Sequence, residues 1–293
     1  MARLDRWSDA DIERIKLTTS CRDCDAIPKV ADAGLCFGDN LEFQRMHNGV
    51  VIRRGSYHGE WMTEVIQELR GHHEPQEEKV FAEVLACMDA GASMVELGSF
   101  WAYYSMWFQR AVPDAVSIMV EPNAEKLNVG KLHFELNKMT GTFVHGFVGD
   151  HSLPSARFVD WDGREAWIPQ VGVDELMAQR KMEYVDILHA DIQGAEYSML
   201  ESAKLALAGR RIKYLFLSTH GCEHARCLRL IRHHGYRIIA EHSVLESVSG
   251  DGLIVAASPD LPLPPTVLIS KRHVSTVERF RYSLACLKRI LFG

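Results

Sequence analysis

The segment after residue 91 alternates between short apolar runs and amphipathic runs, and this alternation restricts the folds open to the chain. The apolar runs have the length of buried strands, and the runs between them have helical spacing. A strand–helix repeat predicts a mainly parallel sheet that is covered by helices on both faces. The last two expected strands have no helix between them, so we expect them to be antiparallel. The seven expected strands are 92–98, 115–122, 140–149, 185–192, 212–220, 236–245 and 251–259.

The rest of the chain is organised around this sheet. Residues 1–70 show little regular pattern before a helical segment at 59–71, and we expect them to form a helical and irregular N-terminal cap. Residues 71–260 are expected to form the main domain, with a hairpin at 157–173 that turns at "DWDG". Residues 261–293 join a proline-rich linker to a basic amphipathic helix. We expect this helix to pack on the chain itself or in a homodimer; an anionic membrane surface is the alternative.

Composition argues against several classes of partner. The 293 residues carry a net charge of −6, which gives no global field that would attract nucleic acid. No apolar run approaches the roughly 20 residues of a transmembrane helix, and the first residues lack the apolar region of a signal peptide. The cysteines number seven, an odd count without an export signal, which indicates reduced thiols in a cytoplasmic protein.

The stretch "VELGSFWAYYS" (95–105) contains the first expected turn from strand to helix. In an open parallel sheet, ligands bind beyond the carboxyl ends of the strands, near such a turn. Gly98 allows the backbone to approach a ligand, and the helix N-terminus supplies free amides. A dinucleotide site needs three glycines, whereas this turn has Gly98 alone, with Ala102 at the helix-packing position. Glu96 would also repel a buried pyrophosphate, so the turn argues against a nicotinamide dinucleotide.

Two carboxylates stand at the ends of successive expected strands. Glu121 follows Glu96 by 25 positions, a spacing typical of a carboxylate that accepts both ribose hydroxyls of a nucleoside. S-adenosylmethionine carries an α-ammonium, a sulfonium and a ribose but no phosphate, so it suits a site with two carboxylates. Either acid alone is equally compatible with a strand end that binds no ligand, but the pair predicts a nucleoside-type cofactor.

At these residues the chain resembles the FkbM family of S-adenosylmethionine-dependent methyltransferases. The family motif "DVGANIGYYS" is similar to "ELGSFWAYYS" (96–105), and a family strand ending in "EP" is similar to "VEPN" (120–123). "FVHGFVGD" (143–150) resembles the family's strand and turn beside adenine, and residues 173–200 resemble its "DELL" helix followed by a "KIDVEGAE" block. The resemblance covers residues 74 to about 257 and implies a class I methyltransferase, Rossmann-like fold with S-adenosyl-L-methionine as cofactor. The cofactor site that it implies consists of Glu96, Gly98, Ser99, Ser105, Glu121, Asn123, Val148, Gly149 and Asp191.

The chain departs from the family pattern on the expected substrate side. Phe100 and Trp101 replace small or aliphatic residues, and Ala102 replaces a glycine. We expect the two aromatic residues to pack into the interface between sheet and helix; the alternative is that they narrow the cofactor entrance. His189 stands where the family usually has lysine, and Gln193 stands where it has glutamate. These changes bear on the acceptor and the chemistry more than on the fold.

A catalytic rim is expected at the ends of two neighbouring strands. His189 and Asp191 are two positions apart on one strand and therefore face the same side, and His220 ends the next strand. Transfer of a methyl group to a hydroxyl needs a proton acceptor, and an imidazole suits this task near neutral pH. We predict that His189 or His220 is the base and that Asp191 orients the base or binds the acceptor. Alternatively, these histidines are structural, or the three residues bind a divalent metal, which we do not favour.

The resemblance implies methylation of a hydroxyl group on a sugar, a glycan or a natural product, and it leaves N-methylation and carboxyl methylation open. The expected partner is therefore a small-molecule or glycan acceptor. Two other classes stay open. One is a NAD-dependent oxidoreductase on a similar sheet, and the other is a non-catalytic binding module in which Phe100 and Trp101 crowd the cofactor turn.

The motif "CRDC" (21–24) has the spacing of half a zinc site. Cys36, His47 and His58 would have to complete that site, and we expect reduced thiols in the cap instead.

The polar segment "GHHEPQEE" (71–78) precedes the first expected strand and begins a helix. It forms either a solvated first turn or a lid in which Glu74, Gln76 or Glu77 closes over the cofactor or holds the acceptor.

Overall fold

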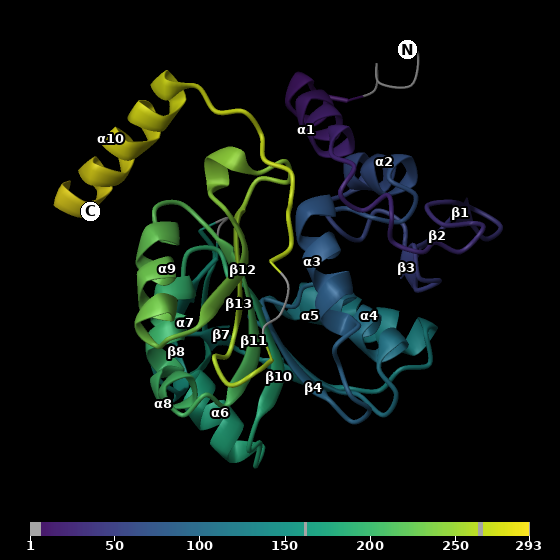
Figure 1. Ribbon diagram of the computed structural model, residues 1–293. Coiled ribbons are helices and arrows are strands. Elements are labelled where there is room, and N and C mark those ends of the chain that lie inside the picture. The colour runs from purple at the N-terminus through teal and green to yellow at the C-terminus, as the bar shows by residue number, and fades with distance from the viewer. Residues whose placement is uncertain (1–6, 161–162, 263–265, 293) are drawn as a thin grey trace.

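The computed structural model describes residues 7–160, 163–262 and 266–292. At its centre is a seven-stranded sheet with the order β12–β13–β11–β10–β4–β5–β6 (Figure 1). Neighbouring strands are parallel from β6 to β11, and β13 is antiparallel to both β11 and β12. The predicted mainly parallel sheet with an antiparallel last strand is therefore confirmed. The strands are β4 (Ser93–Leu97), β5 (Val116–Glu121), β6 (Thr142–His145), β10 (Val185–Asp191), β11 (Ile212–Thr219), β12 (Arg237–His242) and β13 (Gly252–Ala257).

The sheet separates two apolar clusters because successive residues of a strand point to opposite faces. On β10, Ile187 belongs to one cluster and Leu188 belongs to the other. Figure 1 shows α3, α4 and α5 on one face of the sheet and α6, α7, α8 and α9 on the other. These helices are α3 (Pro75–Leu85), α4 (Tyr103–Ala111), α5 (Ala124–Leu136), α6 (Val173–Gln179), α7 (Glu196–Ser202), α8 (Lys204–Ala208) and α9 (His224–His233).

The single strand expected at 140–149 is divided in the structure. The backbone amide of Gly146, just beyond β6, donates to the Glu121 carbonyl at the end of β5 (3.2 Å). The chain then leaves the main sheet as β7 (Phe147–Val148), which pairs with β9 (Glu165–Val171). The predicted hairpin is present as β8 (Leu153–Val159) and β9, although Trp161 and Asp162 of its turn lie outside the described residues.

The N-terminal segment, which has no clear sequence pattern, forms a small sheet and two helices. Its residues Met46 and Ile52 join the same apolar cluster as Phe81 of α3. Asn137, at the end of α5, exchanges hydrogen bonds with the Val51 backbone (2.8 and 2.7 Å). The segment thus shares an apolar core with the main domain, and the domain boundary at residue 70 stays a prediction. Its elements are α1 (Asp9–Ser20), β1 (Cys36–Phe37), β2 (Phe43–Arg45), β3 (Val51–Arg53) and α2 (Glu60–Glu68).

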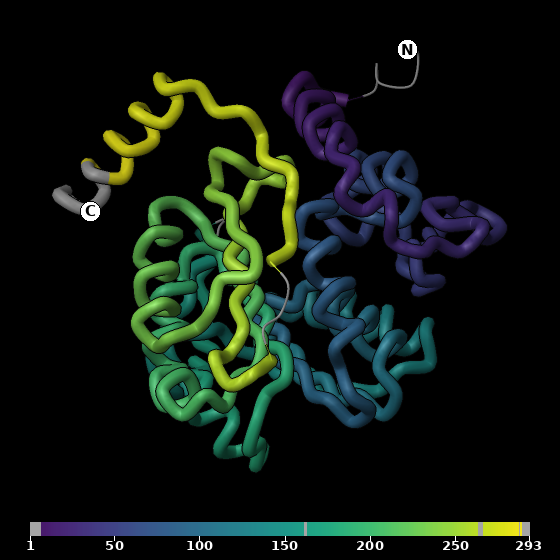
Figure 2. Tube along the Cα trace, in the orientation of Figure 1, coloured from purple at the N-terminus to yellow at the C-terminus, as the bar shows by residue number. Residues whose placement is uncertain are grey.

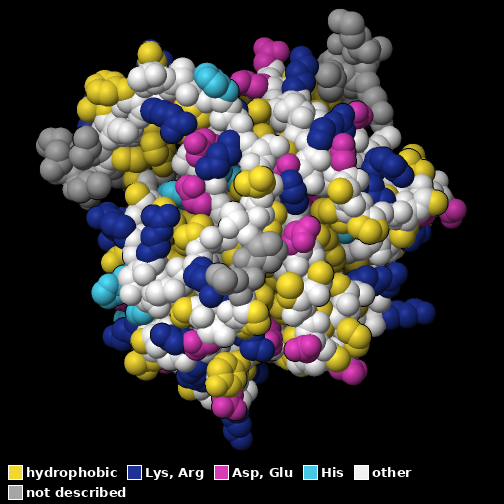
Figure 3. Space-filling view, in the orientation of Figure 1, with side chains coloured by type: hydrophobic (Ala, Val, Ile, Leu, Met, Phe, Trp, Pro, Cys, Tyr) yellow, Lys and Arg dark blue, Asp and Glu magenta, His cyan; other side chains and the backbone are white. Residues whose placement is uncertain are grey.

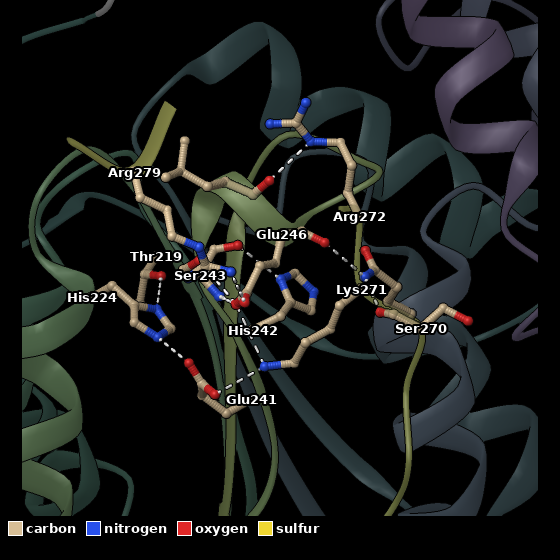
Figure 4. A network of polar contacts seen from close by, with 12 residues as sticks. Thr219, His224, Glu241, His242, Ser243, Glu246, Ser270, Lys271, Arg272 and Arg279 are labelled. Carbon is tan, nitrogen blue, oxygen red and sulfur yellow. Dashed lines mark hydrogen bonds and ion pairs between the residues drawn. The ribbon is translucent and has the colours of Figure 1, made fainter. Parts of the chain in front are cut away.

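Residues 266–275 form an extended strap that runs back along the domain (Figure 2). Gln76 of α3 donates to the Ser270 carbonyl at 2.5 Å, and the Ser270 amide donates to Asp23 of the N-terminal segment at 2.6 Å. The strap therefore joins α3 to the N-terminal segment. Figure 4 shows a second set of anchors, in which Lys271 meets both Glu241 (3.3 Å) and Glu246 (3.4 Å).

The C-terminal helix α10 (Thr276–Phe292) stands away from the sheet at the end of this strap (Figure 1). Its apolar side chains Val277 and Phe280 are 58% and 68% exposed, and apolar side chains gather on this part of the surface in Figure 3. The apolar side of α10 is thus not buried against its own domain at these two positions. Dimerisation through α10 stays a prediction. None of the helices within the described ranges has the length and apolar content that crossing a bilayer requires.

A disulfide joins α10 to the rim of the sheet, contrary to the expectation that all thiols are reduced. Cys222 follows β11 and is bonded to Cys286 of α10, with their Cα atoms 5.4 Å apart. The Tyr282 hydroxyl also donates to the Gly221 carbonyl in the same loop. The 64 positions between the two cysteines carry no spacing signal, so the fold alone brings them together.

We predict that Cys286→Ser releases α10 from the loop after β11. The remaining anchors are the Tyr282 hydrogen bond to Gly221 and ion pairs such as Arg279 with Glu246 (3.2 Å), and surface pairs of this kind stabilise by only about 0–1 kcal/mol. Amide hydrogen exchange in α10 should therefore accelerate by at least ~10-fold, whereas Cys87→Ser, at an exposed free cysteine, should leave it unchanged. Equal exchange rates in the wild type and the Cys286→Ser protein would show that the disulfide does not hold the helix.

Candidate active site

The turn between β4 and α4 lies against the end of β10. Gly98 has a φ of 75°, and a Cβ at this position would overlap the Asp191 carbonyl oxygen. The glycine is therefore required by the close approach of two backbones, whatever ligand the turn binds. Phe100 (φ 40°) and Ala102 (φ 58°) also adopt the left-handed conformation, which non-glycine residues rarely do. A turn with this geometry has to be held by specific interactions.

Two buried carboxylates hold the turn. Glu121 accepts hydrogen bonds from the backbone amides of Phe100 (3.1 Å) and Asn123 (2.9 Å). Glu96, on the neighbouring strand, accepts one from the Ser105 amide in the first turn of α4 (3.1 Å). Burial raises the pKa of Glu96 to about 6 and also raises the pKa of Glu121, although the amide hydrogen bonds oppose this. The two acids stand at neighbouring strand ends as expected.

The other residues predicted to bind the cofactor lie between β4 and α4, in α4, just ahead of α5 and at the end of β7. The Ser99 hydroxyl is buried without a hydrogen-bond partner, whereas the Ser105 side chain hydrogen-bonds Glu96 and opposes the rise in the pKa of that carboxyl. The Asn123 side chain caps α5 by accepting from the amides of Glu125 and Lys126, at 2.9 and 3.1 Å. Val148 ends β7 and is buried, and the Gly149 amide donates to Val171 of β9 (3.1 Å). These two residues therefore belong to the edge formed by the small second sheet.

The two aromatic residues of the turn pack on the N-terminal segment. Trp101 is stacked between Tyr57 (ring centroids 4.3 Å apart) and Tyr103 (4.9 Å). Phe100 meets the edge of the Tyr57 ring at 5.2 Å and carries the Lys126 ammonium over its face at 4.3 Å. Both residues pack as expected, but they also contact Tyr57 of the N-terminal segment, beyond the sheet and helix. The aromatic contacts with Tyr57 fix the N-terminal segment over the first turn.

His189 is held inside the domain by α3. Its Nε2 lies 2.7 Å from Oε1 of Glu77, whose other oxygen accepts from the Ser218 hydroxyl at 3.1 Å. Burial alone would lower the pKa of His189, but the Glu77 charge outweighs burial and raises it. His189 is only 3% exposed and lies under the Tyr104 ring. This histidine is therefore a poor candidate for a free base.

His220 is enclosed by three carboxylates. Its Nδ1 lies 2.8 Å from Glu196, and its Nε2 lies 3.0 Å from Asp251 and 3.3 Å from Asp191. Burial opposes the charged form, but these acids outweigh it and raise the pKa of His220 to about 11. This pKa favours the imidazolium form of His220 at neutral pH, although the Gln193 amide nitrogen also lies 2.8 Å from its Nε2.

Asp191 is the rim group whose proton affinity suits neutral pH. Burial is the main cause that raises its pKa to about 7, and the charges of Asp251, Glu74 and Glu77 add to the effect, while His220 lowers it. The Gln193 amide donates to the Asp191 carboxylate at 3.1 Å. The structure thus brings Asp191 and His220 together as predicted. Within the described residues, His189, Asp191 and His220 do not converge as a metal-ligating group.

The polar segment at 71–78 contributes to the site through two of the three residues proposed. Glu74 accepts from the Tyr104 hydroxyl at 2.9 Å, and Glu77 binds His189. Gln76 instead accepts from the Val248 amide at 2.9 Å and belongs to the strap contacts. Sequence reasoning also missed two groups at the rim, Glu196 and Asp251, of which only Glu196 stands in a recognised motif.

The strand order and the site at the carboxyl ends of β4, β5 and β10 define a class I methyltransferase fold of the Rossmann-like type. The family model of the methyltransferase FkbM domain matches residues 86–238, just over half of the chain. The chain therefore belongs to the FkbM methyltransferase domain family.

Solved structures with a similar fold include several methyltransferases. TrmK of M. capricolum, solved with S-adenosyl-homocysteine, shares 14% identity over 68% of this chain and 72% of its own, with a TM-score of 0.40. Precorrin-6y C5,15-methyltransferase of Geobacter metallireducens shares 15% identity over 61% of this chain and 87% of its own, also at 0.40. Such low scores transfer neither substrate nor residue roles. The chain has no match among curated proteins.

The three carboxylates around His220, which we call the ion cage, predict the pH at which its ring loses a proton. Since its folded pKa of about 11 lies above the unfolded value near 6.5, its contribution to stability is fully present below about pH 6.5 and is lost as pH rises toward 11. The difference in unfolding free energy between wild type and His220→Gln should therefore shrink between about pH 7 and 10. NMR should show the ring still protonated at pH 8, whereas His234, whose pKa burial lowers, should already be neutral. A His220 that titrates near pH 6.5 would contradict the cage.

Proposed function

We propose that this protein uses S-adenosyl-L-methionine to methylate a hydroxyl group of a sugar, a glycan or a natural product. The observation that carries the proposal is Asp191, a carboxylate with a pKa near 7 at the end of β10, in backbone contact with the first turn. One strand end carries both a proton acceptor and the turn proposed to bind the cofactor. This arrangement fits the transfer of a methyl group between two bound molecules. Family membership supports methyl transfer, and the acceptor class follows the family resemblance.

The first turn has groups that fit the cofactor. The buried Ser99 hydroxyl, which has no hydrogen-bond partner, supplies a free donor and acceptor beside Gly98. The oxygens of Glu121 retain lone pairs for ribose hydroxyls beyond those used by the turn amides. Glu96 adds a negative charge that suits the cofactor's cationic groups. When bound there, the cofactor would supply an electrophilic methyl group; the chain's own part is to orient it and exclude water.

The base in this proposal is Asp191 rather than a histidine. A proton acceptor works best when its pKa lies near the operating pH, and only the carboxylate meets that condition at this rim. His220 then acts as a fixed cation that keeps Asp191 ionised and oriented. His189 acts through Glu77, by holding α3 against the sheet. This proposal differs from the prediction made from the sequence, in which His189 or His220 is the base and Asp191 orients the base or binds the acceptor.

The acceptor in this proposal lies between the rim and the N-terminal segment. Asp191 and Asp251 offer carboxylate oxygens, which suit the adjacent hydroxyls of a polyol. The same negative charges would repel a phosphate-rich acceptor, in keeping with the net charge of −6. Tyr57, stacked on Trp101 and close to the charges of Glu74 and Asp191, places the N-terminal segment beside this acceptor site.

Cofactor binding is tested with Glu121→Gln, which keeps the shape of the side chain but removes its charge. Loss of a charged hydrogen-bond acceptor should weaken S-adenosyl-homocysteine binding by roughly 10- to 100-fold, measured by isothermal titration calorimetry. Glu125→Gln, on the first turn of α5, is the matched control and should bind like the wild type. Tight binding of NAD by the wild type, without binding of S-adenosyl-homocysteine, would instead establish the oxidoreductase alternative.

The base is tested with Asp191→Asn in an assay with labelled S-adenosylmethionine and a panel of glycosides and polyols. For any hydroxyl acceptor that the wild type methylates, the variant should lose about 10²- to 10⁴-fold in kcat while it keeps its affinity for S-adenosyl-homocysteine. The acid limb of the wild-type rate should lie near pH 7 and should move upward in His220→Gln, because Asp191 loses its cationic partner. A kcat unchanged in Asp191→Asn would exclude Asp191 as the base.

A further inference from the structure

A second polar cluster lies inside the domain, between the N-terminal segment and the helix face of the sheet. His47 follows β2, His72 precedes α3, and Glu78 lies in α3. One ligand atom from each of these three residues lies within 4.8 Å of the other two. Their exposures are 2%, 0% and 0%, so the cluster has no contact with solvent. Within the described residues, this is the one group of histidine, cysteine and acidic side chains with metal-ligand spacing.

His47, His72 and Glu78 are arranged as a set of metal ligands, and Tyr103 lies behind His47 as a hydrogen-bond partner. Nδ1 of His72 contacts a carboxylate oxygen of Glu78, and the His47 ring stacks on His72 with centroids 4.1 Å apart. Nδ1 of His47 lies 2.9 Å from the Tyr103 hydroxyl. A metal-bound histidine usually donates its second ring nitrogen to such a neighbour, which orients the ring. Nε2 of His72 is also buried without a partner, on the part of the ring that faces away from Glu78.

A buried ion pair explains only part of this arrangement. Glu78 also accepts from the backbone amide of His73 (3.0 Å) and approaches Nδ1 of the same residue (2.6 Å), which accounts for the carboxylate. It does not account for His47, whose ring stacks on His72 and brings a third ligand atom within 4.8 Å of the other two. The ion pair therefore leaves the position of the His47 ring unexplained.

We propose that His47, His72 and Glu78 bind one Zn²⁺ that ties the N-terminal segment to α3. Two imidazoles and a carboxylate are a common zinc ligand set. Tetrahedral bonds of about 2.0–2.2 Å place ligand atoms ~3.3 Å apart, so binding requires the two stacked rings to tilt apart. Complete burial makes the site structural rather than catalytic. The "CRDC" motif has the spacing of half a zinc site. Of the residues considered for that site, only His47 belongs to the group of His47, His72 and Glu78, and Cys21, Cys24, Cys36 and His58 do not.

The test uses the full chain, first stripped with EDTA and then titrated with Zn²⁺ or Co²⁺. Elemental analysis after dialysis should give one Zn²⁺ per chain, Co²⁺ should give visible absorption that the stripped protein lacks, and Zn²⁺ should raise Tm. Glu78→Gln, which preserves shape, should weaken metal affinity by at least ~100-fold. His133→Gln is the matched control, because His133 is equally buried but bonds Trp101 and Arg53 instead.

Several results would overturn the proposal. Binding of less than about a tenth of an equivalent of Zn²⁺ by the wild type would leave a buried ion pair as the whole explanation. Equal affinity in Glu78→Gln and His133→Gln would place any bound metal elsewhere. If Glu78→Gln fails to fold by circular dichroism, His47→Gln gives the same comparison. None of these measurements involves methyl transfer, so their failure is separate from that of the proposed function.

Discussion

The close approach of the first turn to the end of β10 places the turn directly beside Asp191. The absence of a side chain at Gly98 lets the turn rest on the Asp191 carbonyl, and Glu96 and Glu121 then hold the turn by its amides. A turn that contains two non-glycine residues in the left-handed conformation needs such restraint. Because one contact fixes both the cofactor turn and the carboxylate beside it, donor and acceptor of a methyl group would be placed by a single structural constraint.

The charge of the rim follows from an excess of carboxylates. Asp191, Glu196 and Asp251 surround a single imidazole, so the histidine takes the positive charge that the site requires. An isolated histidine titrates near neutrality, but its surroundings decide its pKa once it is enclosed. Burial, with a smaller contribution from neighbouring acids, raises the pKa of Asp191 to about 7. Acid and base roles therefore depend on the set of neighbours more than on the residue type.

The fold of the main domain could be predicted because it depends on local patterns. Alternating strands and helices determine a parallel sheet, and strands that run in parallel bring Glu96 and Glu121 to the same edge. The division of one expected strand at Gly146 could not be predicted, because it depends on the path of the chain into a second sheet. The carboxylates around His220 include Glu196 of α7 and Asp251 of the loop before β13. No spacing in the sequence indicates that these residues meet, so the cage could not be predicted.

The first turn of α3 connects the rim, the buried cluster and the strap. Successive helical residues point about 100° apart, so neighbours in the sequence reach different surroundings. Glu74 contacts Tyr104, and Glu77 contacts His189. Glu78 contacts His72, and Gln76 donates to the Ser270 carbonyl. A shift of this turn would change all of these contacts together. A metal bound by Glu78 would therefore affect Glu77 and the rim through the position of α3, although it touches no reacting atom.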